Sequence, residues 1–296
     1  MLSQWFLVGA GRCGLQLARA LSASGLEVVG VETRSPAGRA RARRALPGVA
    51  TSPPGSPLPE GAALLIAVPD SAVEGCARAL ARRLRAPAPL ALHTAGMLPA
   101  AALAPLAAKG CPIGSFHPLV SFPTATGPAV SVTGAVAAVE GDASAVREAR
   151  RLARALGMIP VRLPPSAKPG YHAAAALAAN MTHVLVAAAR AEFVRAGFSP
   201  RGAATALGPL VLGSVEAALS ARGLEHLTGP VARGDAAAVR AHLEALPNEL
   251  ATVYRAVASL ALARLSREHL LSEGQGRKVA SALTTQGMCV RFEMRP

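Results

Sequence analysis

The chain has 296 residues, of which 51% are hydrophobic and 3% aromatic, a composition that excludes a disordered polymer and allows two domains with cores of their own. Its formal net charge of +14 brings nucleic acid into consideration as a partner. We expect no such partner, because the arginines are spread along the chain and no aromatic side chains interleave with the densest arginine run, residues 39–44.

Residues 5–8 form an apolar run that meets a glycine cluster, and a helical pattern follows until Gly25. This order predicts a strand, a turn and a helix. The first glycine of the cluster allows a tight turn, the second lets a pyrophosphate approach the backbone, and the third lets the helix pack on the strand. A purely structural turn is the alternative. We assign dinucleotide binding to Gly9, Ala10, Gly11, Arg12, Cys13 and Gly14.

The second predicted strand, residues 28–31, leads into Glu32 and then into Arg34 and Ser35. An acid at this position grips the ribose 2′-hydroxyl and favours NAD. Arg34 and Ser35 would instead hold a 2′-phosphate through a charge-assisted contact and a hydroxyl. Because a basic helix is predicted next, at residues 36–46, we predict NADP as the cofactor, with NAD as the alternative.

Strands and helices continue to alternate as far as residue 163. The strands are apolar on both faces, which is typical of a parallel sheet covered by helices on both sides. The predicted fold class is therefore an α/β Rossmann-type parallel sheet domain followed by an all-α dimerisation and substrate domain. Further strands are predicted at residues 49–51, 62–68, 90–93, 113–116, 130–139 and 159–163, and further helices at residues 71–84, 100–108 and 143–156.

In such a sheet, ligands bind at the carboxyl ends of the strands. One predicted strand ends at Val68, Pro69 and Asp70, and the next ends at His93. We assign these four residues to cofactor binding. For His93 the alternative is a loop histidine that caps the turn over residues 94–96.

After Pro164 and Pro165, the sequence has the period of helices to about residue 271. We therefore place a Rossmann domain at residues 1–164 and a helical domain at residues 165–296. Residues 272–296, the tail of the second domain, are assigned to no element.

The most apolar stretch of the helical domain, residues 173–189, contains Asn180 and His183 near its centre and consists mostly of alanine. A buried helix explains this stretch better than a bilayer span does, so we expect no membrane partner. The four cysteines have no paired metal-type spacing, and the sequence does not open with a secretory leader. We expect a cytoplasmic protein without a metal site.

Six segments carry a family resemblance: the glycine turn and residues 68–70, 93–96, 114–119, 171–174 and 227–235. Together they resemble a group of oxidoreductases in which a Rossmann domain, like those of pyrroline-5-carboxylate reductase and deazaflavin-dependent NADP reductases, precedes a helical domain of unknown function. Architectural relatives are the 3-hydroxyacid and prephenate dehydrogenases, ketopantoate reductase and the C-terminal domain of 6-phosphogluconate dehydrogenase. The resemblance implies a homodimer through the helical domain. It also implies a site for the nicotinamide beside the helical domain. Our hypothesis for the activity is hydride transfer between NADP(H) and a small oxo, hydroxy or imino acid.

Four residues are candidates for catalysis. His117 lies in residues 114–119, which look like the Gly-x-His-Pro element of prephenate dehydrogenases, where the histidine polarises or deprotonates the substrate. Hydride transfer needs a partner proton transfer, which suits a group with an unperturbed pKa of about 6.5. Lys168 precedes a predicted helix on which His172 and Asn180 share a face that would meet the cofactor. The alternative is a buried helix whose polar side chains bond to one another or to the backbone.

The resemblance to 3-hydroxyacid dehydrogenases and ketopantoate reductase is incomplete at this helix. There a lysine and an asparagine four residues later serve the reaction, whereas here the residue four positions after Lys168 is His172. The departure supports an alternative function, a regulatory or scaffold protein that binds the dinucleotide without turning it over.

A turn before a late helix contains the substrate-binding candidates Thr228 and Arg233. A similar turn faces the substrate in imine reductases, and Arg233 would anchor a carboxylate there. The alternative is an ion pair between Arg233 and Asp235 or another neighbour. Asp235 itself is predicted to cap the helix at residues 236–246.

Overall fold

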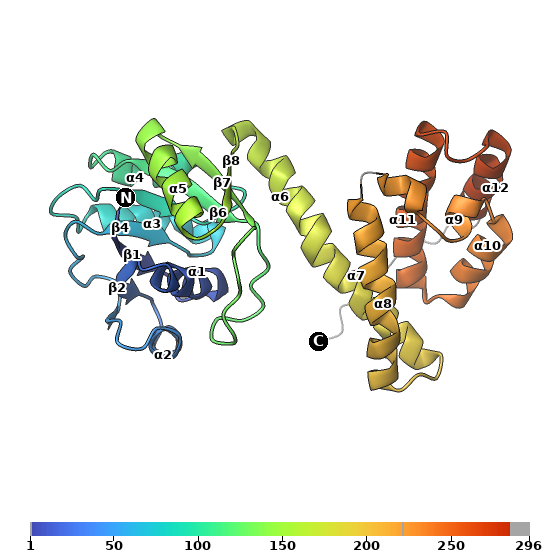
Figure 1. Cartoon of the computed structure of the whole chain (residues 1–296), viewed down its shortest axis with the longest axis horizontal. Coiled ribbons are helices and arrows are strands. Elements are labelled where there is room, and N and C mark those ends of the chain that lie inside the picture. The colour runs from blue at the N-terminus through green and yellow to red at the C-terminus, as the bar shows by residue number, and fades with distance from the viewer. Residues whose placement is uncertain (1, 221, 285–296) are drawn as a thin grey trace. The chain divides into compact units, whose positions relative to one another are not determined.

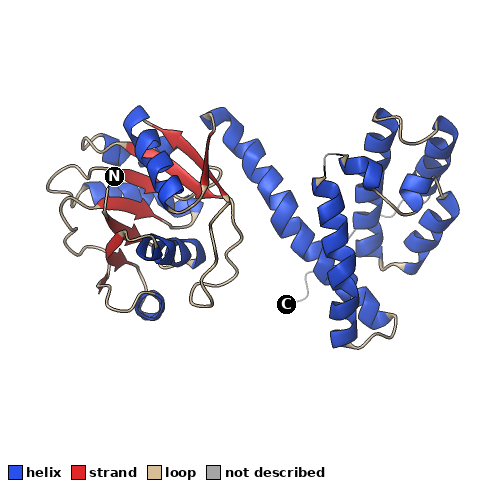
Figure 2. Cartoon of the chain, in the orientation of Figure 1, coloured by secondary structure: helices blue, strands red, loops and turns tan. Residues whose placement is uncertain are grey.

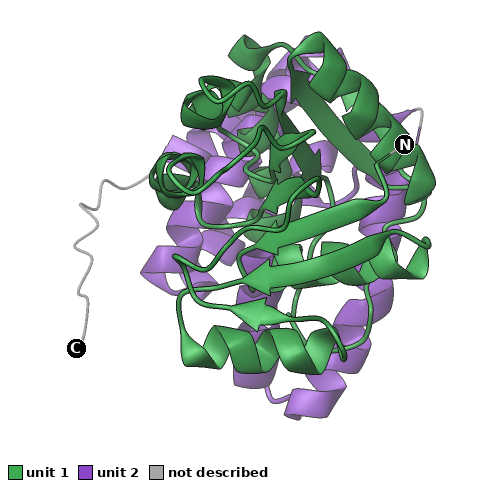
Figure 3. Ribbon diagram, turned by 90° about the vertical axis from the view of Figure 1, so that its left-hand side faces the viewer, with its two compact units in different colours: residues 1–181 green, residues 182–296 purple. Residues whose placement is uncertain are grey.

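The computed structural model describes residues 2–220 and 222–284. The chain divides into two compact units between Met181 and Thr182, which Figure 3 shows in different colours. The first unit therefore extends 17 residues past the predicted boundary at residue 164 and contains the helix that begins at Lys168.

The first unit is built on one eight-stranded sheet in the order β3-β2-β1-β4-β5-β6-β7-β8 (Figures 1 and 2). Neighbouring strands are parallel except for β6 and β7, which are antiparallel. The predicted Rossmann-type sheet is thereby confirmed, and residues 130–139 contribute to a single strand. The strands are β1 Gln4–Val8, β2 Glu27–Glu32, β3 Thr51–Ser52, β4 Ala63–Ile66, β5 Ala91–His93, β6 Ile113–Pro118, β7 Val136–Gly141 and β8 Ile159–Arg162.

Helices cover both faces of this sheet, because its strands are apolar on both sides. One face buries Leu7 and Leu17 with Leu152, and the other buries Ile66 with Leu80. The helices of the first unit are α1 Arg12–Ala23, α2 Pro36–Ala45, α3 Val73–Ala81, α4 Ala104–Ala107, α5 Ala143–Ala155 and α6 Lys168–Ala176, with short 3-10 turns at Asp70–Ala72, Ala100–Leu103 and Pro165–Ala167.

A long loop, residues 119–135, follows β6 and is held to α1 by the half-buried Arg19, which donates to the carbonyl oxygen of Gly127 at 2.7 Å, and by the buried side chain of Gln16. The amide nitrogen of Gln16 donates to the carbonyl oxygens of Thr124 and Pro128, each at 3.1 Å. The amide oxygen of Gln16 accepts from the backbone N–H of Val130 at 3.0 Å. The loop after β6 is therefore tied to the helix that follows the glycine turn.

The second unit is helical, as predicted. A small core of Val239, Ala258, Val279 and Leu283 joins three of its helices, so part of the tail that the sequence left unassigned is a helix. A π-helical turn, Leu177–Met181, precedes this unit. Its helices are α7 Thr182–Arg195, α8 Pro200–Leu219, α9 Pro230–Arg233, α10 Ala236–Ala245, α11 Asn248–Arg267 and α12 Glu273–Thr284, with a 3-10 turn at Gly223–His226.

Two helical segments, Pro165–Arg195 and Pro200–Leu219, are long and apolar enough to cross a membrane by length and composition alone. None of the most apolar window of the first segment is buried inside the described chain. The expectation of a buried helix over residues 173–189 is therefore wrong for a single copy of the chain. Core helices of soluble proteins pass the same length and composition test, so these segments are weak evidence for a membrane span.

Candidate active site

The glycine turn has the geometry that a phosphate-binding loop requires. Gly9 has a φ of +109°, and a Cβ atom there would lie 2.3 Å from the carbonyl oxygen of Ala67. A Cβ atom on Gly14 would lie 2.8 Å from the carbonyl oxygen of Gly9, whereas one on Gly11 would meet nothing within 4 Å. Gly9 and Gly14 thus serve the turn and the packing of α1, and Gly11 leaves its outer side open.

The open side of the turn faces uncapped backbone amides. Gly11 is the N-cap of α1, and no described side chain caps that helix. The first helical bond joins the N–H of Leu15 to the carbonyl oxygen of Gly11, so the amides of the first turn, at Arg12, Cys13 and Gly14, have no intrahelical acceptor. Such a helix end attracts anions, and these residues fit the pyrophosphate of a dinucleotide.

The carboxylate at the end of β2, that of Glu32, is already bound by an arginine side chain. The carboxylate of Glu32 accepts two hydrogen bonds from Arg83, at 2.7 and 3.1 Å, and the residue is only 4% exposed. Arg34 is exposed, and the hydroxyl of Ser35 caps α2 by accepting from the N–H of Gly38 at 3.0 Å. The sequence could not reveal the ion pair, because its partners lie 51 residues apart.

Several predicted cofactor-binding residues follow the carboxyl ends of strands. Val68, Pro69 and Asp70 follow the end of β4 after one residue, and Val68 lies beside Gly9. His93 ends β5 but is fully buried. Its Nδ1 accepts from the N–H of Ala95 at 3.2 Å, and its Nε2 is 3.1 Å from the carbonyl oxygen of Pro99.

These two contacts fix the tautomer of His93, with Nε2 protonated and donating to Pro99. Burial lowers the pKa of His93 to about 4, so the ring is neutral near pH 7. His93 therefore holds the loop after β5, and both of its ring nitrogens are engaged by the backbone.

A row of buried polar side chains crosses the middle of the sheet. Strand register pairs His93 with Ser115 and Ser115 with Glu140, which places the three side chains on one face. Glu140 accepts from the N–H of Ala100 at 2.7 Å. The Nζ atom of Lys168 donates to the hydroxyl of Ser115 at 2.5 Å, and Lys168 is only 1% exposed.

Lys168 is thus an anchor between α6 and β6. Burial lowers its pKa, and the nearby charges of Glu140 and Asp70 oppose that shift. Its amine is enclosed by the sheet and bonded to Ser115, which leaves it poorly placed to meet a substrate.

The same face of α6 carries two aromatic side chains that meet His117. Tyr171 and His172 lie three and four residues after Lys168, on one face of the helix. The hydroxyl of Tyr171 is 2.9 Å from Nδ1 of His117. The rings of His117 and His172 are 5.8 Å apart, centre to centre, and inclined by 76°. Burial lowers the pKa of His117 to about 4, with smaller contributions from His172 and Lys168.

Gly96 completes this cluster, although its sequence pattern predicted no role for it. A Cβ atom on Gly96 would lie 2.4 Å from Nδ1 of His172 and 2.8 Å from Nε2 of His117. The two ring nitrogens therefore converge on Gly96 at the carboxyl edge of the sheet. The available signal was a glycine three residues after a buried strand ending in histidine, within residues 93–96.

The remaining predicted residues are not part of this cluster. Asn180 is exposed and lies in the π-helical turn after α6. Because that turn interrupts the α-helical period, the expected common face of His172 and Asn180 is not maintained. Thr228 and Arg233 are exposed residues of the second unit, where Asp235 caps α10 by accepting from the N–H of Ala238. Their roles stay predictions.

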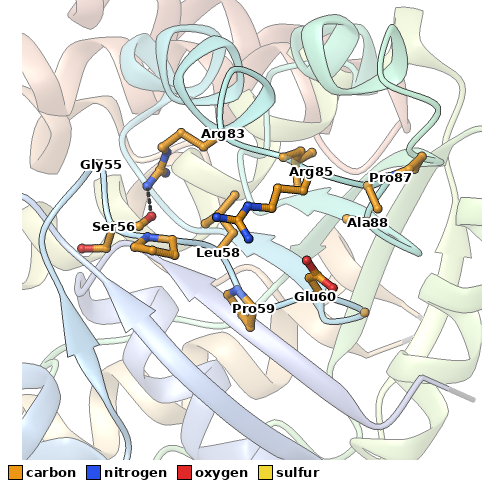
Figure 4. A pocket seen from close by; sticks show the side chains of 13 residues that line it. Gly55, Ser56, Leu58, Pro59, Glu60, Arg83, Arg85, Pro87 and Ala88 are labelled. Atoms are coloured by element: carbon orange, nitrogen blue, oxygen red, sulfur yellow. Dashed lines mark hydrogen bonds between the residues drawn. The ribbon is translucent and has the colours of Figure 1, made fainter.

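A separate pocket of about 280 Å³ lies between residues 55–61 and 83–88 (Figure 4). Arg83 lines it and donates to the carbonyl oxygen of Ser56 at 2.8 Å. These segments precede β4 and β5, so the pocket is at the amino ends of the strands. It is therefore distinct from the cluster around His117.

Two family models match the sequence, one for a Rossmann-like domain over residues 4–118 and one for a domain of unknown function, DUF2520, over residues 135–261. These matches confirm the resemblance inferred from the sequence. No curated protein matches the chain significantly.

Solved structures share the fold of the chain. A "putative NADP oxidoreductase" of Bacteroides fragilis is 19% identical, with a TM-score of 0.73 over 88% of this chain and 98% of its own. Protein TM1727 of Thermotoga maritima is 21% identical, with a TM-score of 0.65 over 90% and 99%. A pyrroline-5-carboxylate reductase of Coxiella burnetii is 16% identical, with a TM-score of 0.55 over 97% and 100%. At these identities the likeness concerns the fold alone.

Proposed function

We propose that the chain is an NADP(H)-dependent oxidoreductase that transfers hydride to or from a small oxo, hydroxy or imino acid. One observation carries the proposal. The carboxyl edge of a single sheet holds both an uncapped glycine turn that suits a pyrophosphate and an imidazole, His117, held in place by Tyr171.

The cofactor would be held by residues of the first unit. The first-turn amides of α1 bind the pyrophosphate, and the open side of Gly11 lets it approach. Bound NADP(H) would supply the hydride. The carboxylate of Glu32 forms an ion pair with Arg83 and is therefore not free to bind a ribose hydroxyl. The exposed side chain of Arg34 is the better placed group for a 2′-phosphate, which supports NADP over NAD.

Proton transfer is assigned to His117 rather than to Lys168. Tyr171 occupies Nδ1 of His117, so Nε2 is the nitrogen left for a substrate. The neutral ring accepts a proton during oxidation of a substrate and returns it during reduction. Lys168 instead positions α6 through Ser115.

Fluorescence titration with NADPH and NADH, followed by turnover of 2-oxo, 3-hydroxy and cyclic imino acids, tests the proposal. We expect tighter binding of NADPH and turnover of at least one class. If neither reduced dinucleotide associates at millimolar concentration, the proposal is wrong. Tight NADPH binding without turnover of any compound would favour the regulatory or scaffold alternative.

We also propose a homodimer formed through the helical unit. Apolar side chains are exposed along α7 and α8 in the single chain, including Val184 at 59% and Leu212 at 65%. Monomeric soluble proteins rarely expose large contiguous apolar patches, and a second copy would cover these side chains. The proposal includes a cytoplasmic location, with no membrane, nucleic-acid or metal partner.

A further inference from the structure

The side chain of His172 has an unmet hydrogen-bonding atom. Its Nδ1 is closed off from solvent and has no partner among the described residues. Buried polar atoms are nearly always bonded, so an exception calls for an explanation such as a ligand that completes the site.

A second ring nitrogen points to the same place. The position of a Cβ atom on Gly96 lies within 3 Å of both Nδ1 of His172 and Nε2 of His117, at 2.4 and 2.8 Å. The two nitrogens are therefore near enough to each other for one oxygen atom to lie at an ordinary hydrogen-bond length of about 2.8 Å from both, beside the Cα atom of Gly96 rather than at the Cβ position itself. Nδ1 of His172 is enclosed in this structure, so the two rings would have to move apart to admit the oxygen. A larger side chain at residue 96 would fill the space that this movement requires.

We infer that His117 and His172 together hold the reacting oxygen of a hydroxy or oxo substrate beside Gly96. This inference rests on the proposed function and narrows its substrate class. It assigns an oxygen, and not an iminium nitrogen, to the reacting position.

The chemistry of the cluster selects oxygen. A hydroxyl group can accept a hydrogen bond from one imidazole and donate one to the other, and a carbonyl oxygen can accept from an imidazole N–H. The nitrogen of a protonated imine has no free lone pair and can only donate. The charges that act on His117 are those of His172 and Lys168. Positive charge on Lys168 opposes a cationic substrate and stabilises negative charge that develops on an oxygen.

The reaction balances with these two rings and the dinucleotide. In the oxidation of an alcohol, bound NADP+ would take up the hydride that the carbon loses. The hydroxyl loses its proton to the imidazole that accepted its hydrogen bond, and a carbonyl forms. Reduction reverses each transfer.

The test uses the full chain with 15N-labelled histidine, saturated with NADP+ or NADPH. Matched hydroxy, oxo and cyclic imino acids are added while the ring nitrogens of His117 and His172 are followed by NMR. The variants are Gly96→Ala and, as a matched control, Gly75→Ala, because Gly75 is exposed on α3 with nothing within 4 Å of its Cβ position.

We expect at least one hydroxy or oxo acid to shift both imidazoles, and Gly96→Ala to weaken its binding on the order of a hundredfold while NADPH affinity stays unchanged. Gly75→Ala should behave like the parent chain. The inference is overturned if only cyclic imino acids shift the rings, if no compound shifts them, or if Gly96→Ala has no effect. If the parent chain binds no NADPH, the proposed function itself has failed.

Discussion

The contacts of His117 and Lys168 give these two candidates for proton transfer different roles. The amine of Lys168 donates to the buried hydroxyl of Ser115, whereas His117 bonds to Tyr171 through Nδ1 and keeps Nε2 available. Burial and spacing along a helix are visible in a sequence, but the partner of each polar atom is not. The pairing of Tyr171 with His117 joins residues 54 positions apart.

Tyr171→Phe tests the positioning role of the phenol. Without its hydroxyl, the ring of His117 is free to change tautomer and orientation. We expect kcat to fall roughly tenfold, with a changed pH–rate profile and an unaltered NADPH dissociation constant. Tyr254→Phe is the matched control, because Tyr254 pairs with His242 in the second unit. An identical pH profile for Tyr171→Phe and the parent chain would contradict the role.

His93 links protonation to stability. Its pKa is lowered to about 4 in the folded chain, so between that value and the usual 6.5 the unfolded chain binds more protons. The stability that neutral His93 contributes is present above pH 6.5 and is lost as the pH falls toward 4, on the order of 3 kcal/mol in all.

Urea unfolding between pH 7 and pH 4 measures this loss. We expect the free energy of unfolding of the parent chain to fall over that range, and His93→Gln to show a shallower fall from a lower starting value. His226→Gln, a change at an exposed histidine, should keep the slope of the parent chain. Equal slopes for all three proteins would refute the linkage.

At the scale of elements, the sequence predicted the main strands and helices well where its pattern was regular. The 12-residue helix α1 and the 13-residue helix α5 were recognised from their apolar period. The reversed direction of β7 was not predicted, because alternating apolar segments do not state which way a strand runs. The π-helical turn at Leu177–Met181 was not predicted either, because it lies within an unbroken alanine-rich run.

The glycine turn offers a matched pair of variants. Gly9→Ala forces a side chain into a φ of +109° and against Ala67, so we expect a loss of more than about 3 kcal/mol of stability. Gly11→Ala should fold normally, because its φ is −81° and its Cβ position is open. It should weaken NADPH binding by about tenfold, since the methyl group stands where the pyrophosphate approaches. Thermal unfolding and NADPH titration separate the two effects, and equal NADPH affinity for Gly11→Ala and the parent chain would argue against the assigned site.

The end of β2 decides between the two cofactors. Arg34→Glu should raise the NADPH dissociation constant by roughly ten- to a hundredfold and leave that of NADH almost unchanged, because only NADPH carries the 2′-phosphate. Arg85→Glu makes the same charge reversal at the amino ends of the strands and should affect neither. An unaltered NADPH dissociation constant for Arg34→Glu would show the assignment to be wrong.

At the scale of the whole molecule, the two domain types were predictable, and the division between them was less so. A proline pair and a change of period marked residue 164, yet α6 belongs with the sheet because Lys168 and Tyr171 bind β6. Such contacts join residues that are far apart in the chain, so no periodic pattern in the sequence predicts them.

Light scattering coupled to size exclusion tests the proposed dimer. We expect the parent chain to elute with twice the mass of one copy, and Leu212→Glu to shift the equilibrium toward the monomer by placing a charge on the apolar surface. Glu216→Gln, on the same helix, should remain dimeric. A monomeric parent chain would overturn the dimer, and partition into detergent micelles would point to a membrane instead.

The link that Gln16 makes between α1 and the loop after β6 bears on the range of pH and salt concentration over which this part of the fold is kept. Its three contacts are made by a carboxamide, which neither titrates nor attracts counterions. A lower pH that protonates the imidazoles, or a high salt concentration that screens the arginine side chains, leaves these three hydrogen bonds intact, although Arg19 of α1 also donates to the carbonyl oxygen of Gly127 in the same loop, at 2.7 Å. We therefore expect the connection between α1, which follows the glycine turn, and the loop after β6 to keep its structure under conditions in which the imidazoles no longer transfer protons.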